Sequence, residues 1–293
     1  NLLFFFTTIV IYDIINYNIW IQKSQCKKGF SKYKIKKGEI RMEKENQKRA
    51  KGINKLRLKI GMIIFLIMFS ISQGADEYKA VALSDQEGNI LEGENIDLVH
   101  PLAALTKLMT GLVAIKQIDK GKFSYDDEIT ISRTTASVRG SSVRLRTGQK
   151  VTLEELIEGA VVKSGNDAAY GVAEYISGSE EEFVKLMNEE AKKMGLEDTE
   201  FFTSTGLPTN MTEKNMDIGT ARDMIKLAAE SLKYPKIIEM AEKESVKIGN
   251  RNYQNTNTLV ETMEEVDGRK TGYHSKAKYN LILTSKKDGV RLI

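Results

Sequence analysis

The most apolar helical pattern beyond the N-terminal segment lies between Leu102 and Ile115. Apolar side chains recur there at the three- and four-residue spacing of a helix face, and the only charged residue is Lys107. The pattern predicts a buried helix over 102–119, with Pro101 in its first turn and Gly121 just past its end. The apolar face consists of Leu105, Leu108, Met109, Leu112 and Val113.

Weaker patterns on either side predict strands at both ends and further helices in the middle. Residues 78–83 and 90–91 flank a polar, glycine-containing turn and predict a β-hairpin. A capping box from Thr152 to Glu155 begins the next predicted helix. This order indicates an α+β fold, in which an antiparallel sheet of N- and C-terminal strands packs on a helical middle. The expected helices cover 152–162, 167–176, 180–194 and 220–231; after residue 245 the pattern turns to strands, best seen in 279–284 and 290–293.

The segment that begins at Met42 is typical of a signal peptide. A basic stretch precedes the almost wholly apolar residues 60–71, and Ser72-Gln73-Gly74 offers small residues for cleavage. We interpret 42–74 as a signal peptide, with an uncleaved membrane anchor as the alternative, and 1–41 as upstream or leader sequence, with a first membrane helix as the alternative. Residues 75–293 are then expected outside the cytoplasm, on the periplasmic or cell-wall side of the membrane.

Charge divides the chain in the same place. Residues 1–74 have a net charge of +11, whereas residues 75–293 contain 29 Lys and Arg against 36 Asp and Glu, a net charge of −7. The basic character therefore belongs to the leader, and the body does not indicate a nucleic-acid partner. The only cysteine is Cys26, so residues 75–293 contain no disulfide and no thiol nucleophile.

Lys107 is the first candidate for chemistry. A buried ammonium is costly, so Lys107 must either pair with a carboxylate or lose its proton more readily than a free lysine, unless its amine reaches the surface. The second possibility describes a catalytic base. Such a base would serve a side chain one helical turn earlier, at position 104. That residue is Ala104, which has no reactive group.

Two further short motifs have polar groups suited to a site. Ser164-Gly165-Asn166 interrupts a helical pattern, where a hydroxyl and an amide can relay a proton and hold a peptide group. The alternative is an ordinary helix break, with Asn166 as the N-cap. Lys270-Thr271-Gly272 precedes a strand pattern, where a cation and a hydroxyl suit a carboxylate and glycine permits close approach. The alternative there is a solvated turn.

The three sites together resemble a known set. Ser-x-x-Lys, Ser-x-Asn and Lys-Thr-Gly elements are found in penicillin-binding proteins and serine β-lactamases. The surrounding residues resemble the secreted D-alanyl-D-alanine carboxypeptidases, or low-molecular-mass penicillin-binding proteins, over residues 77–293. The segments that carry the resemblance are 105–110, 163–168, 187–188, 195–196 and 267–273.

This resemblance implies a β-lactamase/transpeptidase-like fold and a serine hydrolase that removes the terminal D-alanine from peptidoglycan stem peptides. Position 104 would hold the nucleophile and Lys107 would be its base. Ser164 and Asn166 would relay the proton and bind the peptide. β-Lactam antibiotics would occupy the same cleft, and the family requires no metal or other cofactor. The substrate carboxylate would be bound by Lys270, Thr271 and Gly272.

The sequence also departs from the family. Ala104 stands where the serine is expected, which excludes an acyl-enzyme at that position and indicates either an inactivated carboxypeptidase or a non-catalytic module that binds D-Ala-D-Ala. A third possibility, a β-lactamase, lacks a convincing glutamate-bearing loop. Lys278 stands where a small residue is expected after Ala277. Because Ile293 falls within a strand pattern, we expect the domain to lack its C-terminal part, including any membrane anchor.

Overall fold

The computed structural model describes residues 78–293. The upstream segment 1–41 and the predicted signal peptide 42–74 therefore lie outside the described residues. Among the residues that are described, no helix is both long and apolar enough to span a bilayer.

Two antiparallel sheets come from opposite ends of the described chain. The N-terminal hairpin pairs β1 (Val81–Ser84) with β2 (Ile90–Glu94), which confirms the predicted hairpin. The C-terminal sheet has the order β11-β10-β9. Its strands are β9 (Val266–His274), β10 (Lys278–Lys287) and β11 (Val290–Leu292).

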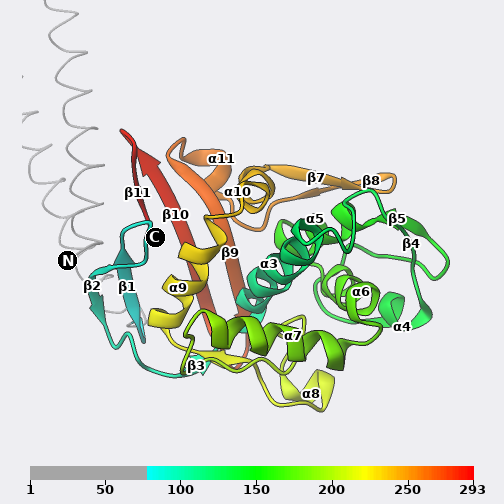
Figure 1. Ribbon diagram of the computed structural model, residues 1–293, viewed down its shortest axis with the longest axis horizontal. Coiled ribbons are helices and arrows are strands. Elements are labelled where there is room, and N and C mark those ends of the chain that lie inside the picture. The colour runs from blue at the N-terminus through cyan, green and yellow to red at the C-terminus, as the bar shows by residue number, and fades with distance from the viewer. Residues whose placement is uncertain (1–77) are drawn as a thin grey trace, which may run out of the picture. The chain divides into compact units, whose positions relative to one another are not determined.

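The two sheets meet through residues Ser84 and Ile293. The Ser84 amide donates to the Ile293 carbonyl at 2.9 Å, and the Ile293 amide donates back to the Ser84 carbonyl at 3.0 Å. The single sheet expected from the sequence is therefore a two-stranded and a three-stranded sheet joined at this edge. Figure 1 shows the C-terminal sheet at one side of the helical part, with α4, β4 and β5 at the opposite side.

The central helix of the fold is α3 (Thr106–Asp119), preceded by a 3-10 turn over Ala103–Leu105. Because helices surround α3 on several sides, the apolar face predicted from the sequence is buried, whereas Ile118 near the end of the helix is partly buried. The helix contacts α5 (Leu153–Val161) and α6 (Asn166–Ser177). The remaining helices are α4 (Arg133–Ser137), α7 (Glu180–Lys193), α8 (Thr209–Thr212), α9 (Ala221–Ser231), α10 (Pro235–Glu242) and α11 (Leu259–Thr262).

Local signals placed the ends of α5, α6, α7 and α9 to within one residue, whereas α4, α8, α10 and α11 were not predicted. The Thr152 hydroxyl accepts the Glu155 amide at 3.1 Å, and the Glu155 carboxylate accepts the Thr152 amide at 2.9 Å, so the predicted capping box is confirmed. Two short strand pairs were not predicted, because two or three residues carry little pattern. They are β3 (His100–Pro101) with β6 (Ile218–Gly219), and β4 (Glu128–Thr130) with β5 (Lys150–Thr152). A third pair, β7 (Ser245–Ile248) with β8 (Arg251–Gln254), lies after residue 245, where strands were expected.

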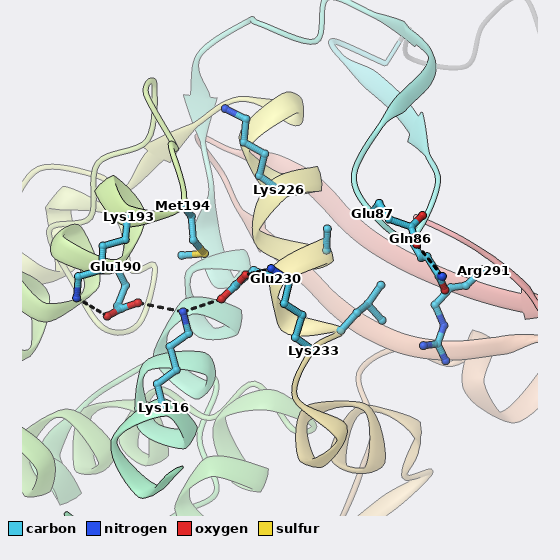
Figure 2. A pocket seen from close by; sticks show the side chains of 12 residues that line it. Gln86, Glu87, Lys116, Glu190, Lys193, Met194, Lys226, Glu230, Lys233 and Arg291 are labelled. Atoms are coloured by element: carbon cyan, nitrogen blue, oxygen red, sulfur yellow. Dashed lines mark hydrogen bonds and ion pairs between the residues drawn. The ribbon is translucent and has the colours of Figure 1, made fainter. Parts of the chain in front are cut away.

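An ion-pair cluster joins three helices away from the predicted site. The Lys116 ammonium lies between the carboxylates of Glu190 and Glu230, at 3.0 and 2.9 Å (Figure 2). Lys193 donates to Glu190 and Lys233 donates to Glu230, so each carboxylate is shared by two lysines. The side chains of Lys116 and the two glutamates are largely buried, and the cluster therefore connects α3, α7 and α9 in a partly shielded environment.

Candidate active site

A cleft brings the three predicted motifs together. Its walls are the start of α3, the turn before α6, the β9–β10 hairpin and the loop 205–211. Because these segments are distant in sequence, only the tertiary fold places them side by side. Six of the seven predicted site residues line the cleft, and Lys270 lies against it through a hydrogen bond to Ser164: the six are Ala104, Lys107, Ser164, Asn166, Thr271 and Gly272.

Ala104 lies in the 3-10 turn, closely packed between two glycines. A Cβ on Gly206 would lie 1.9 Å from the Ala103 carbonyl oxygen, and a Cβ on Gly272 would lie 3.2 Å from the Ala104 amide nitrogen. Only glycine allows these backbones to approach so closely. The side chain of Asn280 also donates to the carbonyls of Pro101 and Leu102, at 2.9 and 3.2 Å. Strand β9 is therefore held against the backbone of position 104.

Lys107 is buried and has no ion-pair partner among the described residues. Its side chain is 1% exposed, and its Nζ donates to the Thr205 carbonyl at 2.6 Å. Burial disfavours the charged form and lowers the pKa of Lys107 to about 7, against the opposing influence of the carboxylates of Asp217 and Asp167. Of the possibilities considered for Lys107, the structure supports the one in which it loses its proton readily.

Ser164 and Lys270 form a second buried pair. Lys270 is 1% exposed, and its Nζ donates to the Ser164 Oγ and to the Thr271 carbonyl, both at 3.0 Å. Burial lowers the pKa of Lys270 well below its usual value, and the nearby Lys107 lowers it further. Ser164 has a φ of +62°, in the left-handed region, which turns its side chain out of the helical path. The site therefore contains two amines of reduced basicity, one of which, Lys270, is hydrogen-bonded to Ser164.

Asn166 is the first residue of α6 and not its N-cap. Gly165 occupies the cap position, and no side-chain cap hydrogen bond is formed. The alternative that Asn166 caps the helix is therefore wrong. Its Nδ2 instead donates to the Arg139 carbonyl at 2.8 Å, and a Cβ on Gly140 would lie 2.5 Å from that Nδ2. The loop that contains Arg139 and Gly140 therefore fixes the Asn166 amide at the wall of the cleft.

The Lys-Thr-Gly motif lies within strand β9, not in a solvated turn. The Thr271 hydroxyl donates to the Thr256 hydroxyl at 3.0 Å, and both residues line the cleft. The rings of the neighbouring Tyr273 and Tyr279, which also line the cleft, pack against each other with their centroids 4.5 Å apart. Lys278, where a small residue was expected, has a φ of +60°, a conformation that glycine adopts without strain.

Sequence reasoning missed four residues that support the cleft. Thr205, Thr256 and Asn280 act through contacts with residues more than 14 positions away, which no local pattern reveals. Asp217 is fully buried and accepts hydrogen bonds from the amides of Phe202 and Thr203 and the hydroxyls of Thr203 and Thr106. Burial nevertheless raises its pKa to about 6. Asp217 thus fixes the start of α3.

Within residues 78–293 no cluster of three or more histidine, cysteine, aspartate or glutamate side chains is arranged to hold a metal ion. The two histidines of the chain, His100 and His274, lie near the tip of the β9–β10 hairpin. His100 Nε2 is 2.8 Å from the Ala277 carbonyl, and His274 Nδ1 accepts the amides of Lys276 and Ala277. Both rings therefore bond to the backbone of the hairpin turn.

Comparison with known proteins agrees with this cleft. A family model described as D-alanyl-D-alanine carboxypeptidase, peptidase S11, matches residues 72–293. The chain is 39% identical over 228 residues to D-alanyl-D-alanine carboxypeptidase DacF of Bacillus subtilis, covering 76% of this chain and 57% of that protein. It is 32% identical over 226 residues to DacA of Escherichia coli, covering 74% and 55%. The chain thus spans just over half the length of these relatives.

Solved structures show the same fold. Penicillin-binding protein 6B from Escherichia coli matches with a TM-score of 0.68 and 33% identity, covering 73% of this chain and 68% of that chain. Penicillin-binding protein D2 from Listeria monocytogenes, in its ampicillin-bound form, matches with a TM-score of 0.66 and 28% identity, covering 73% and 86%. The fold is therefore that of the penicillin-binding proteins, with the expected β-lactamase/transpeptidase-like α+β architecture. The chain belongs to the D-alanyl-D-alanine carboxypeptidase family, whose members are serine-type hydrolases.

Proposed function

We propose that the cleft binds the D-Ala-D-Ala end of peptidoglycan stem peptides, and that the chain with Ala104 binds this end without forming an acyl-enzyme. The relatives named as D-alanyl-D-alanine carboxypeptidases support the substrate class. The observation that carries the proposal is that Ala104, Lys107 and Ser164 line one cleft and that Lys270 donates a hydrogen bond to Ser164.

The groups of the cleft support this binding. In the proposal, the Thr271 hydroxyl and the Lys270 amine bind the terminal carboxylate, and the Asn166 amide binds a peptide group. Among residues 78–293 no carboxylate lines the cleft, so an anionic ligand meets no like charge from this part of the chain. β-Lactams, which resemble the acyl-D-alanine unit in having a carboxylate next to an amide, are proposed to bind in the same place.

A serine at position 104 would complete the chemistry. Its Oγ would attack the carbonyl carbon of the penultimate D-alanine, and the neutral Lys107 amine would accept the hydroxyl proton. The C–N bond would then break, and the leaving D-alanine amine would take up a proton relayed by Lys107 or Ser164. Water would then hydrolyse the ester between the acyl group and the serine. With Ala104 none of these covalent steps can begin, whereas binding of the D-Ala-D-Ala end does not need the hydroxyl.

The experiment compares the 293-residue chain with its Ala104→Ser variant, using a fluorescent penicillin followed by a denaturing gel. We expect covalent labelling in the serine variant alone, because loss of a nucleophile typically costs several orders of magnitude in rate. An Ala104→Gly variant controls for changes in packing at the 3-10 turn. A folded serine variant without label would contradict an intact site and favour a module whose catalytic groups have diverged.

We also propose that residues 78–293 act outside the cytoplasm, where peptidoglycan is found. The proposal is supported by the basic and apolar pattern of residues 42–74. Membrane attachment through that segment is part of the same proposal. Fractionation of cells that produce the tagged chain tests it, since recovery of the protein in the cytoplasm would contradict it.

A further inference from the structure

A positively charged surface lies beside the cleft on a body that is otherwise acidic. Between Ile129 and Leu153 the chain has no aspartate or glutamate, although residues 75–293 have a net charge of −7. Five exposed residues from this loop and the β7–β8 hairpin form no ion pair within residues 78–293. We call them the arginine surface: Arg139, Arg144, Arg146, Lys247 and Arg251.

The loop is held so that these arginines face solvent. The buried Asp167 carboxylate accepts the amides of Val143 and Leu145, at 3.0 Å each. Val143 and Leu145 are consequently buried in the core, whereas the alternating Arg144 and Arg146 are exposed. The exposure of the two arginines thus follows from a fixed backbone, not from a free loop.

The β7–β8 hairpin extends the same surface. The Tyr253 hydroxyl donates to the Val143 carbonyl, and a Cβ on Gly249 would lie 3.1 Å from the Gln149 side chain. These contacts place the hairpin, with Lys247 and Arg251, against the loop. Two carboxylates of the neighbouring helix α5 are engaged elsewhere, since Glu158 pairs with Lys243 and Glu155 accepts the Gly249 amide.

The arginine surface is continuous with the cleft. Gly140 and Ser141, which follow Arg139, line the cleft wall, and the Arg139 carbonyl accepts the Asn166 side chain. A ligand whose end occupies the cleft can therefore extend over the arginines without leaving the protein surface. Charge complementarity then requires that the extension be anionic.

We infer that the arginine surface binds peptidoglycan as a polymer, through the carboxylates of stem peptides that neighbour the one in the cleft. The inference rests on the proposed function, because it takes the ligand of the cleft to be a D-Ala-D-Ala end. Every uncleaved stem peptide ends in a carboxylate, so a strand presents such groups repeatedly. Several weak exposed contacts add up on such a polymer, whereas a short soluble peptide engages the cleft alone.

The test compares polymer binding with binding of a short ligand. The probes are purified peptidoglycan freed of phosphate polymers, measured by co-sedimentation, and a soluble N-acyl-D-Ala-D-Ala dipeptide, measured by calorimetry. The Arg144→Gln/Arg146→Gln variant of the 293-residue chain is compared with a matched control, Lys120→Gln/Lys192→Gln. This control removes two exposed lysines that form no ion pair within residues 78–293.

We expect the arginine variant to bind peptidoglycan about three- to tenfold more weakly at low salt, with unchanged affinity for the dipeptide. The control variant should match the parent, and raising the salt concentration should reduce the difference between the variants. Equal losses in both variants, or no loss in either, overturn the inference. Anionic lipid vesicles that bind through Arg144 and Arg146, without any effect on peptidoglycan, overturn it in favour of a membrane partner. If no variant binds the dipeptide, the proposed function fails, whereas peptidoglycan binding still decides the role of the arginines.

Discussion

Lys107 and Lys270 are two buried amines that water does not solvate. Each is 1% exposed, and neither forms an ion pair among the described residues. The free energy of the charged forms is therefore high, which lowers both pKa values. A lysine with a pKa of about 7 is half neutral near physiological pH, whereas an ordinary lysine is almost fully charged.

The state of Lys107 gives a pH prediction for the Ala104→Ser variant. If the neutral amine is the base, the rate of penicillin labelling should rise through pH 7 and level off above pH 8, because the proton is lost in that range. The rate is measured by timed labelling between pH 5.5 and 9. Circular dichroism at each pH checks that the fold persists. A rate independent of pH would contradict Lys107 as the base.

The Lys107→Gln change in the same Ala104→Ser background should reduce labelling by at least about a hundredfold, because glutamine cannot accept the proton. The amide side chain remains polar and can still donate to the Thr205 carbonyl. Thermal unfolding measures whether the fold tolerates the change. Labelling at the rate of the parent serine variant would exclude Lys107 from the proton transfer.

At the scale of elements, the β9–β10 hairpin connects the carboxylate-binding motif to position 104. Thr271 lies on β9, and Asn280 on β10 bonds to the backbone before the 3-10 turn. Directly after the turn between the strands, Lys278 begins β10 in the left-handed region, at a φ of +60°. A non-glycine residue there costs roughly 1–2 kcal/mol, part of which is conformational strain.

Lys278→Gly should therefore stabilise the protein by about 0.5–1 kcal/mol, since glycine adopts this conformation without strain but loses more backbone entropy on folding. Urea unfolding measures the change. Lys276→Gly is the matched control, because Lys276 lies in the adjacent turn without a positive φ and should be slightly destabilised by glycine. Equal effects of the two substitutions would contradict the explanation.

The elements of the site differ in how far sequence alone could predict them. The α3 pattern, the Thr152 cap and the three motifs are local, and the structure brings those motifs into one cleft. The alternative that Asn166 is the N-cap of the helix was wrong, because Gly165 beside it occupies the cap position. Asp217, Thr205 and Thr256 were missed, because their partners lie at long sequence distances.

At the scale of the whole described molecule, the Lys116 cluster crosses between helices that are far apart in sequence (Figure 2). Replacing Lys116 with a neutral residue would leave the largely buried Glu190 and Glu230 without the cation that they share. Lys193 and Lys233 would still pair with them. Removing one partner of a shielded ion pair costs more than the pair contributes, because an uncompensated charge remains.

Lys116→Met should accordingly lower the free energy of unfolding by about 1–3 kcal/mol, with labelling of the Ala104→Ser variant unchanged. Urea unfolding at low and high salt measures it. Replacing the exposed Lys185, which pairs with Glu182 on a single helix, is the control and should cost less than about 0.5 kcal/mol. A loss as small as that of the control would mean that solvent screens the cluster fully.

The hydrogen bonds between Ser84 and Ile293 impose an order on folding. The N-terminal hairpin is synthesised early, yet its partner strand β11 follows about two hundred residues later in the chain. Until then the hairpin has an unpaired edge, whereas α5, α6 and α7 can form from neighbouring residues. The two sheets can therefore join only after the helices have been made, and the closing of this contact is expected to be a late and slow event in the maturation of the protein.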